Sequence, residues 1–408
     1  MVRRKPARLS LAQALESLLE RILRFEHPAD LELARFFREH PGIGRRDRAL
    51  LADIAFDVLR NRRLYAHLAQ GAGGSLARRL ALLSPAAAKL PRDESEAAWL
   101  ARSQRIDRAS LPAPIRLSLP DWLAGRIERD APAGEFEALA AALLEPAPLD
   151  LRVNILKSDV ATVLAALAGA GIEARPLPDE PNALRVTGKP GLENLDAFAQ
   201  GWFEVQDLGS QRLCRFAAPR RGQVVVDFCA GAGGKTLALA AAMRSTGQIY
   251  ACDVAPRRLA RLRPRLARSG ASNVQPLGID TERDRRLDRL AGRVDLVLVD
   301  APCSGTGTLR RSPDLKWRIG PEDIGQWAQR QSDILAAAAR LVKPGGSLVY
   351  ATCSLLDEEN GDVASRWEAL ADGAWSRDID AGPDGELRLW PHRDGSDGFF
   401  AVRWRRAA

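Results

Sequence analysis

The chain has 408 residues, of which 46% are hydrophobic and 27% are charged, and its net charge is +8. A chain of this length and composition is typical of a globular protein of two or three domains. No run of about 18 apolar residues occurs, which excludes a predicted transmembrane helix, and the spacing of the five cysteines and four histidines excludes a typical zinc site.

Residues 9–90 are predicted to be helical. Apolar residues recur at helical spacing in the first segment, and residues 47–70 repeat this pattern. Strand-like alternation is nearly absent here, so we expect a small all-helical N-terminal domain covering residues 1–135. The apolar positions that define its first helix are Leu11, Leu15, Leu18, Leu19 and Ile22.

The pattern changes to a mixture of strands and one helix in residues 140–210. Residues 149–157, 183–188 and 202–207 read as strands, and residues 159–172 read as a helix that ends in glycine. We therefore expect a compact α/β module of about 70 residues between the helical domain and the rest of the chain.

From residue 211 onwards, strands and helices alternate regularly. The predicted strands are apolar on both faces, which is typical of parallel strands covered by helices on both sides. Residues 211–408 are therefore predicted to form a doubly wound, mostly parallel sheet. Its predicted strands are 223–230, 247–253, 274–280, 294–302 and 346–354.

A glycine-rich turn, "CAGAGGKT" (229–236), connects the first of these strands with a helix. It is not a phosphate-binding P-loop, because that motif requires glycine where this chain has Cys229. It is also not the dinucleotide motif GxGxxG, because Thr236 occupies the last glycine position. Since Asp227 precedes the turn, the turn better suits a ligand that carries a carboxylate and an amine.

Acidic residues follow or end four successive strands of the predicted sheet. Because carboxyl ends of parallel strands meet at one edge, these residues should line a single crevice. Asp253 is placed to accept hydrogen bonds from ribose hydroxyls, and Asp280 to accept one from an adenine amine. Together with the glycine turn, this pattern predicts S-adenosylmethionine as the cofactor. The four residues are Asp227, Asp253, Asp280 and Asp300.

Two of the predicted strands, 294–302 and 346–354, lead to cysteines, Cys303 in "DAPCSGTG" and Cys353 in "YATCSLLDEEN". A thiolate is a strong nucleophile, and its attack on C6 of a pyrimidine makes C5 reactive toward a methyl donor. A base must then remove the C5 proton before the thiolate can leave. Strand position alone leaves open which cysteine attacks.

The motifs "DFCAGAGGKT", "DAPCSGTGTLRRSPDLKW" and "YATCSLLDEEN", in this order, resemble the RsmB/Sun-type RNA (cytosine-5)-methyltransferases. The resemblance implies a Rossmann-like class I methyltransferase domain over residues 211–408 and an RRM-like module over 140–210. The helical segment more weakly resembles the NusB-like domain of the bacterial RsmB branch, which implies an RNA-binding domain over 1–135 and small-subunit (16S) rRNA as the substrate.

The family resemblance also assigns roles to residues. It implies Cys353 as the nucleophile, Cys303 as the residue that assists release of the adduct, and Asp300 as a contact to the cytosine. It further implies that S-adenosylmethionine is bound by Cys229, Ala230, Gly231, Ala232, Gly233, Gly234, Lys235, Asp253, Asp280 and Asp300. One departure from the usual family pattern is Gly231-Ala232, where an alanine-proline pair is common.

The chain is basic at both ends and acidic in the middle, which favours a nucleic acid partner. Arg310, Arg311, Lys316 and Trp317 follow the Cys303 turn and are predicted RNA contacts, because cations hold phosphates and an aromatic ring can stack on a base. The target cytosine must leave its stack, so we expect a single-stranded or loop region of RNA.

Three alternatives remain open at this level. One is methylation of tRNA or another RNA, and a second is DNA cytosine-5 methylation, in which Cys303 would attack. The third is a non-catalytic RNA-binding factor of ribosome assembly. The N-terminal segment lacks a secretory signal, so we expect a cytoplasmic protein with free thiols. We also expect a monomer without a metal ion or a membrane partner.

Overall fold

The computed structural model describes residues 9–371 and 373–408, so the first eight residues of the predicted helical domain lie outside the described part. The chain divides into two compact units. One contains the residues up to Pro146 together with Thr308–Pro321, and the other contains Ala147–Gly307 and Glu322–Ala408. The segment 308–321 therefore packs with the helical unit, although the sequence places it within the predicted range 211–408. Within the described residues, no helix combines the length and hydropathy needed to cross a bilayer.

The helical unit is built around the amphipathic helices at its N-terminal end. Helix α1 (Leu11–Ile22) begins at a capping box formed by Ser10 and Gln13, and it buries Leu15, Leu18 and Leu19. The remaining helices of this unit are α2 (Ala29–Glu39), α3 (Arg45–Arg60), α4 (Arg62–Leu68), α5 (Leu76–Leu83), α6 (Glu94–Ser103), α7 (Ala113–Arg116), α8 (Asp121–Asp130), α9 (Phe136–Leu144) and α16 (Leu315–Arg318).

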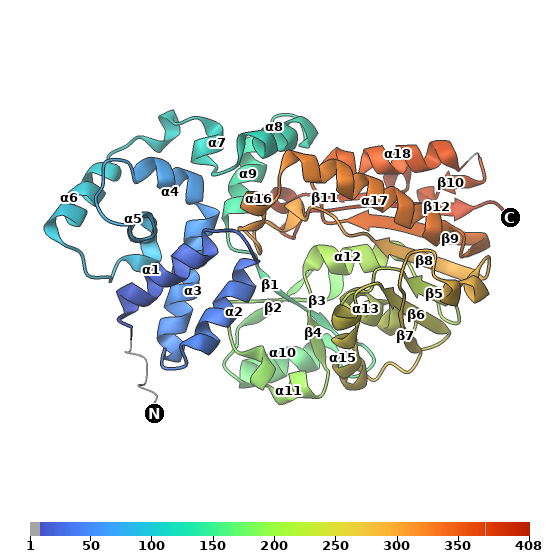
Figure 1. Ribbon diagram of the computed structural model, residues 1–408. Helices are drawn as coiled ribbons and strands as arrows, with labels where there is room; N and C mark the ends of the chain where they lie inside the picture. Colours follow the sequence, from blue (N-terminus) through green and yellow to red (C-terminus); the bar gives the residue numbers. More distant parts are fainter. Residues whose placement is uncertain (1–8, 372) are drawn as a thin grey trace, which may run out of the picture. The chain divides into compact units, whose positions relative to one another are not determined.

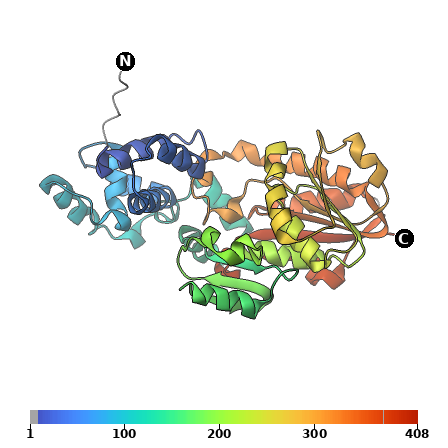
Figure 2. The ribbon, with the colours of Figure 1, turned by 90° about the horizontal axis from the view of Figure 1, so that it is seen from below.

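A small antiparallel sheet forms the first part of the second unit (Figures 1 and 2, green). Its strand order is β2-β3-β1-β4, and helices α10 and α11 pack on it through one shared apolar cluster. The elements are β1 (Leu149–Val153), α10 (Val160–Gly169), β2 (Ala174–Leu177), β3 (Glu180–Val186), α11 (Asp196–Ala199) and β4 (Phe203–Val205).

The large sheet has eight strands, with β10-β12-β9-β8-β5-β6-β7 as its main path and β11 paired to β12. Strands β5 to β9 pair in parallel, and β10, β11 and β12 add antiparallel pairs. This confirms the predicted doubly wound, mostly parallel sheet. The strands are β5 (Val224–Asp227), β6 (Gln248–Asp253), β7 (Val274–Gly278), β8 (Val294–Asp300), β9 (Val342–Thr352), β10 (Trp375–Arg377), β11 (Glu386–Leu389) and β12 (Phe399–Arg406).

Helices cover both faces of this sheet. Alternate residues of a strand point to opposite faces, and they belong to two different apolar clusters. In β8, Val297 and Val299 pack with α17 (Pro321–Ala339) and α18 (Gly361–Leu370). Leu296 and Leu298 instead pack on the opposite face. That face is covered by α12 (Leu208–Ala217) and α13 (Gly234–Ala242), and α15 (Leu262–Ser269) packs beside α13. The shorter helices of this unit are α14 (Pro256–Ala260) and α19 (Pro391–Asp394).

Candidate active site

The glycine-rich turn between β5 and α13 has a backbone that favours glycine at two positions. Gly231 and Gly233 have φ angles of 56° and 82°, and a Cβ on Gly233 would lie 2.2 Å from Cδ1 of Leu262. The N–H of Gly231 donates to Oδ2 of Asp253 at 2.7 Å, which ties the turn to the end of β6. The predicted cofactor residues Cys229, Ala230, Gly231, Ala232, Gly233, Gly234 and Lys235 thus share one turn at the carboxyl edge of the sheet.

Asp227, the last residue of β5, is completely buried beneath this turn. The hydroxyl of Thr236 donates to its Oδ2 at 2.6 Å, whereas Oδ1 has no hydrogen-bond partner among the residues that the structure describes. Burial, helped by the nearby charge of Asp300, raises the pKa of Asp227 to about 7. A buried acceptor without a protein partner is costly, so this oxygen marks a place where a ligand donor would be stabilised.

Lys235 connects the first turn of α13 to the end of β8. Its Nζ donates to Oδ2 of Asp300 at 2.7 Å. Burial alone would lower the pKa of Lys235, but the carboxylate of Asp300 outweighs burial, and the pKa is raised. Lys235 is therefore a permanent cation at this edge of the sheet, and it fixes the position of the Asp300 carboxylate.

The other two predicted acidic residues differ in their surroundings. Asp253 is buried, and its Oδ1 accepts the N–H of Ala255 at 2.7 Å, while Oδ2 accepts that of Gly231. Each oxygen of a carboxylate has a second lone pair, so Asp253 can still accept from hydroxyl groups. The side chain of Asp280 is instead 88% exposed and pairs with Arg286. The structure therefore brings Asp227, Asp253 and Asp300 to the turn and leaves Asp280 at the surface.

The two cysteines lie beside one another at the ends of adjacent parallel strands. Strand β8 pairs with β9, and Sγ of Cys303 is 3.4 Å from Sγ of Cys353. Both residues are partly exposed. The hydrogen bond with Cys353, burial and the negative charge of Glu359 together raise the pKa of Cys303 well above its usual range. Because Cys353 is the main cause of this shift, the two thiols titrate as a pair, and the shift alone does not assign the nucleophile.

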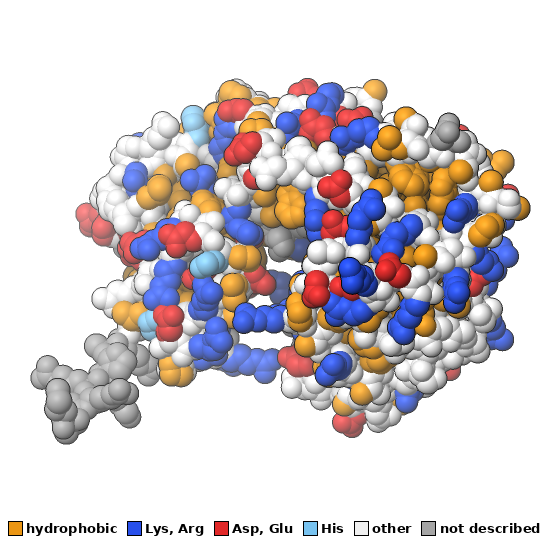
Figure 3. Space-filling model, turned by 45° about the vertical axis from the view of Figure 1, so that its right-hand side comes forward, with side chains coloured by type: hydrophobic (Ala, Val, Ile, Leu, Met, Phe, Trp, Pro, Cys, Tyr) orange, Lys and Arg blue, Asp and Glu red, His pale blue; other side chains and the backbone are white. Residues whose placement is uncertain are grey.

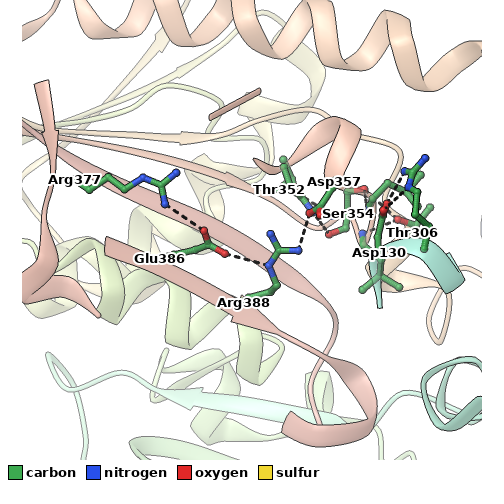
Figure 4. A network of polar contacts seen from close by, with 12 residues as sticks. Asp130, Thr306, Thr352, Ser354, Asp357, Arg377, Glu386 and Arg388 are labelled. Carbon is green, nitrogen blue, oxygen red and sulfur yellow. Dashed lines mark hydrogen bonds and ion pairs between the residues drawn. The ribbon is translucent and has the colours of Figure 1, made fainter. Parts of the chain in front are cut away.

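A buried polar network connects the loops that carry the two cysteines. The N–H of Leu355 donates to Oγ1 of Thr306 at 2.8 Å, and Thr306 lies beside Ser354 in Figure 4. The completely buried carboxylate of Glu359 accepts hydrogen bonds from Ser304 and Ser354. Nothing in the sequence pattern assigned these residues a role. The only signal was the acidic run "DEEN" after Cys353, which is equally typical of an exposed turn.

The same figure shows a second polar chain near Asp357, on the turn that also contains Glu359. Nη1 of Arg388 donates to Asp357 at 2.7 Å, and Glu386 pairs with both Arg388 and Arg377 (Figure 4). This chain ties the turn to β11 and β10. It therefore supports the backbone on which Glu359 lies.

The predicted RNA contacts in segment 308–321 of the helical unit differ in how far their side chains are exposed. Lys316 is only 2% exposed, and its Nζ donates at 2.8 Å to the backbone oxygen of Arg60. Trp317 is partly exposed, and its Nε1 donates at 2.8 Å to the backbone oxygen of Leu59. Both carbonyls belong to the last turn of α3, so these two side chains cap that helix. Burial argues against a phosphate contact by Lys316.

The two arginines of this segment differ from Lys316, because Arg310 and Arg311 are both partly exposed. The backbone oxygen of Arg310 accepts from Nη2 of Arg60 at 3.1 Å, and its own Nη2 donates to the backbone of Pro146 at 3.4 Å. Arg310 and Arg311 therefore stay candidate RNA contacts, whereas Lys316 has a structural role.

Two family descriptions match the chain. Residues 215–405 match "16S rRNA methyltransferase RsmB/F", and residues 119–192 match the "Methyltr_RsmF/B-like, ferredoxin-like domain". The first covers most of the large sheet, and the second covers the first three strands of the small one. The order β2-β3-β1-β4 is that of a ferredoxin-like sheet.

Curated relatives of similar sequence are methyltransferases by name. A "Probable ribosomal RNA small subunit methyltransferase B" of Synechocystis sp. is 34% identical over 312 residues, which are 74% of this chain and 70% of that protein. The "Ribosomal RNA small subunit methyltransferase B" of Salmonella typhi is 36% identical over 287 residues, which are 70% of this chain and 65% of that protein. The chain thus spans about two thirds of the length of these relatives.

Solved structures share the fold of this chain, and one of them is a methyltransferase homologue by name. The "Crystal Structure of PH0851" has a TM-score of 0.80 at 25% identity and covers 98% of this chain and 100% of that one. A "Methyltransferase Homolog Protein from Pyrococcus Horikoshii" has a TM-score of 0.62 at 29% identity, covering 74% and 100%. "NSun6 from Pyrococcus horikoshii with SFG" shares the fold, with a TM-score of 0.63 at 22% identity and coverage of 71% and 98%. The predicted RNA methyltransferase is thereby confirmed at the level of the family, and the chain belongs to the 16S rRNA methyltransferase RsmB/F family.

Proposed function

We propose that the protein transfers a methyl group from S-adenosylmethionine to C5 of a cytosine in small-subunit rRNA, through a covalent bond between Cys353 and C6 of the base. The observation that carries this proposal is the pair of thiols, 3.4 Å apart, at strand ends next to the Lys235–Asp300 pair. The choice of rRNA rests on the names of the relatives.

The residues of the turn fit the proposed cofactor. Oδ1 of Asp227 has no partner among the described residues and is a candidate acceptor for the amine of the methionine part; because this atom is closed to solvent, the contact requires the turn above it to shift on binding. The N-terminus of α13 and Lys235 supply positive charge for its carboxylate, and Asp253 can accept from the ribose. The cofactor supplies an electrophilic methyl group. Asp280 pairs with Arg286 at the surface, so an adenine contact from Asp280 needs a rearranged side chain.

The two cysteines act in different steps of the proposed reaction. The Cys353 thiolate attacks C6 and forms an S–C6 bond, which moves electron density to C5 and allows C5 to accept the methyl group. A base then takes the C5 proton, the C5=C6 bond returns, and Cys353 leaves as a thiolate. The division of roles, with Cys353 attacking and Cys303 assisting release, rests on the family resemblance, and the Sγ–Sγ distance of 3.4 Å places Cys303 close enough to act beside the adduct.

Basic side chains on the surface support an RNA partner. Figure 3 shows Lys and Arg side chains at the surface of each of the two units, interspersed with acidic and apolar ones, and the net charge of the chain is +8. Arg310 and Arg311 are the candidates that we retain from the predicted set. Contacts of this kind release counterions, so binding should weaken steeply as the salt concentration rises.

The test compares Cys353→Ala and Cys303→Ala with wild type, using labelled cofactor and RNA or DNA. Cys353→Ala should lose methyl transfer by at least about a thousandfold, because the nucleophile is removed, while cofactor affinity stays near wild type. Cys303→Ala should accumulate a protein–RNA species that survives denaturing electrophoresis. Cys214→Ala, which removes a buried thiol elsewhere in the same unit, is the matched control and should stay active.

Two outcomes would overturn parts of the proposal. A denaturant-resistant adduct in Cys353→Ala, and not in Cys303→Ala, would exchange the two roles. Methyl transfer to DNA but not to RNA would replace the substrate class.

A further inference from the structure

The most deeply buried acidic side chain near the two thiols is that of Glu359. It ends the short turn Asp357–Glu359 that follows β9, and it is 0% exposed. A carboxylate removed from water is costly unless hydrogen bonds compensate for the lost hydration. The hydrogen-bond partners of its two oxygens therefore explain how the fold stabilises this buried carboxylate.

Each of the two carboxylate oxygens of Glu359 accepts two hydrogen bonds, four in total. Oε1 accepts the backbone N–H of Ser304 at 2.8 Å and Nε2 of Gln331 at 3.0 Å. Oε2 accepts the hydroxyl of Ser354 at 2.6 Å and also the hydroxyl of Ser304. The partners come from the loop after β8, the loop after β9 and helix α17.

Two of these partners are the immediate neighbours of the cysteines. Ser304 follows Cys303, and Ser354 follows Cys353. One carboxylate therefore clamps both cysteine-bearing loops at the residue next to each thiol. The N–H of Gly307, which donates to the backbone oxygen of Cys353 at 2.8 Å, is a further link between the loops.

We propose that Glu359 is a positioning residue that holds the thiols of Cys303 and Cys353 side by side by binding the loops that follow β8 and β9. Its side chain is completely buried, so we assign it a positioning role and not a contact to substrate or cofactor. Its effect on methyl transfer rests on the proposed function, whereas its effect on the distance between the thiols does not. Small displacements of reacting groups are expensive, because about 1 Å can cost on the order of a hundredfold in rate.

Two substitutions separate the carboxylate's geometry from its charge. Glu359→Gln is isosteric: the amide oxygen can take the place of Oε1, and the amide nitrogen can donate to the two serine hydroxyls, which then act as acceptors. Glu359→Ala removes all four hydrogen bonds. Asp362→Asn, which removes an exposed negative charge on the following helix, is the matched control.

The first measurement needs neither RNA nor cofactor. A trivalent arsenical such as phenylarsine oxide binds strongly only where two thiols lie side by side, and mass spectrometry locates it on the two cysteines. Wild type, Glu359→Gln and Asp362→Asn should be bridged at Cys303 and Cys353 with similar rates. Glu359→Ala should be bridged at least about tenfold more slowly, and Cys303→Ala not at all.

The second measurement is methyl transfer under the same conditions, well below the unfolding temperature of each variant. Glu359→Ala should lose about tenfold to a hundredfold in kcat with little change in KM for RNA, and Glu359→Gln should restore most of it. If Glu359→Ala does not fold, Ser354→Ala removes one anchor of the clamp and should slow bridging severalfold.

The outcomes distinguish this inference from the proposed function. Wild-type bridging rates in Glu359→Ala, or in Ser354→Ala if only that variant folds, would overturn the positioning role even if methyl transfer is observed. Slow bridging in the variant, together with no methyl transfer by the wild type, would support the clamp and refute the function. A kcat in Glu359→Gln as low as in Glu359→Ala would show that the negative charge, not the geometry, is what matters.

Discussion

The buried carboxylate of Asp227 makes the binding of the proposed cofactor depend on pH. Burial raises its pKa to about 7, so in the cofactor-free protein it is about half protonated at neutral pH. Its Oδ1 can accept a hydrogen bond from the cofactor's ammonium group most strongly when the carboxylate is ionised. Binding should therefore release a proton from Asp227, and affinity should rise with pH.

The size of this effect follows from the pKa. If only the ionised form binds, affinity scales with the ionised fraction, which increases about tenfold from pH 6 to pH 8 for a group with a pKa near 7. Below pH 6 the affinity should fall by about tenfold for each pH unit. Above pH 8 the contribution of Asp227 should become constant.

Isothermal titration calorimetry of the full chain with S-adenosylmethionine, in buffers of different ionisation enthalpy, measures both the affinity and the proton release. Asp227→Asn is the control, because its amide has nearly the same shape and does not titrate. The variant also reports the pH dependence of the cofactor's own amine. The reasoning is refuted if the ratio of wild-type to variant affinity stays constant between pH 6 and pH 8.

Two further predictions concern stability. Gly233→Ala should destabilise the protein by about 1–3 kcal/mol in thermal unfolding, because the new Cβ would contact Leu262 and the residue has a positive φ. Gly234→Ala is the control and should change the stability by less than about 0.5 kcal/mol. Equal effects of the two substitutions would contradict this prediction. Burial, with the charge of Arg60, lowers the pKa of Lys316 to about 7, so the unfolded chain binds more protons above pH 7 and stability should rise with pH. From pH 7 to 8.5 this gain should be about 1.5 kcal/mol by urea unfolding, and Lys316→Met should abolish it.

The sequence was most informative where the local pattern and the tertiary environment agree. Strands β5, β6, β8 and the second half of β9 were predictable because most of their residues are buried, which produces apolar runs, whereas the edge strand β7 is only partly buried. Strand β2 was not predicted, since it has only four residues and includes Pro176. The small antiparallel strands β10 and β11 were also missed, because segments of three and four residues carry little periodicity.

In the candidate site, too, the residues that belong to a local sequence motif were predictable, and those that depend on tertiary contacts were not. The glycine turn and the two cysteines were predictable because each depends on a contiguous motif at a strand end. The burial of Lys316 could not be predicted, because a basic residue beside a tryptophan gives the same pattern whether its amine faces solvent or caps helix α3. Glu359 was overlooked because an acidic residue after a strand is typical of an exposed turn. Only the fold brings Ser304, fifty-five residues away, to its carboxylate.

Methylation of C5 of a cytosine in RNA is best tested by identifying the product. Small-subunit rRNA that lacks its own modifications is incubated with the protein and S-adenosylmethionine carrying a labelled methyl group, digested to nucleosides and separated by mass spectrometry. The label should be found in 5-methylcytidine, and Cys353→Ala should form none. Label in any other nucleoside, or undiminished 5-methylcytidine with Cys353→Ala, would contradict this expectation.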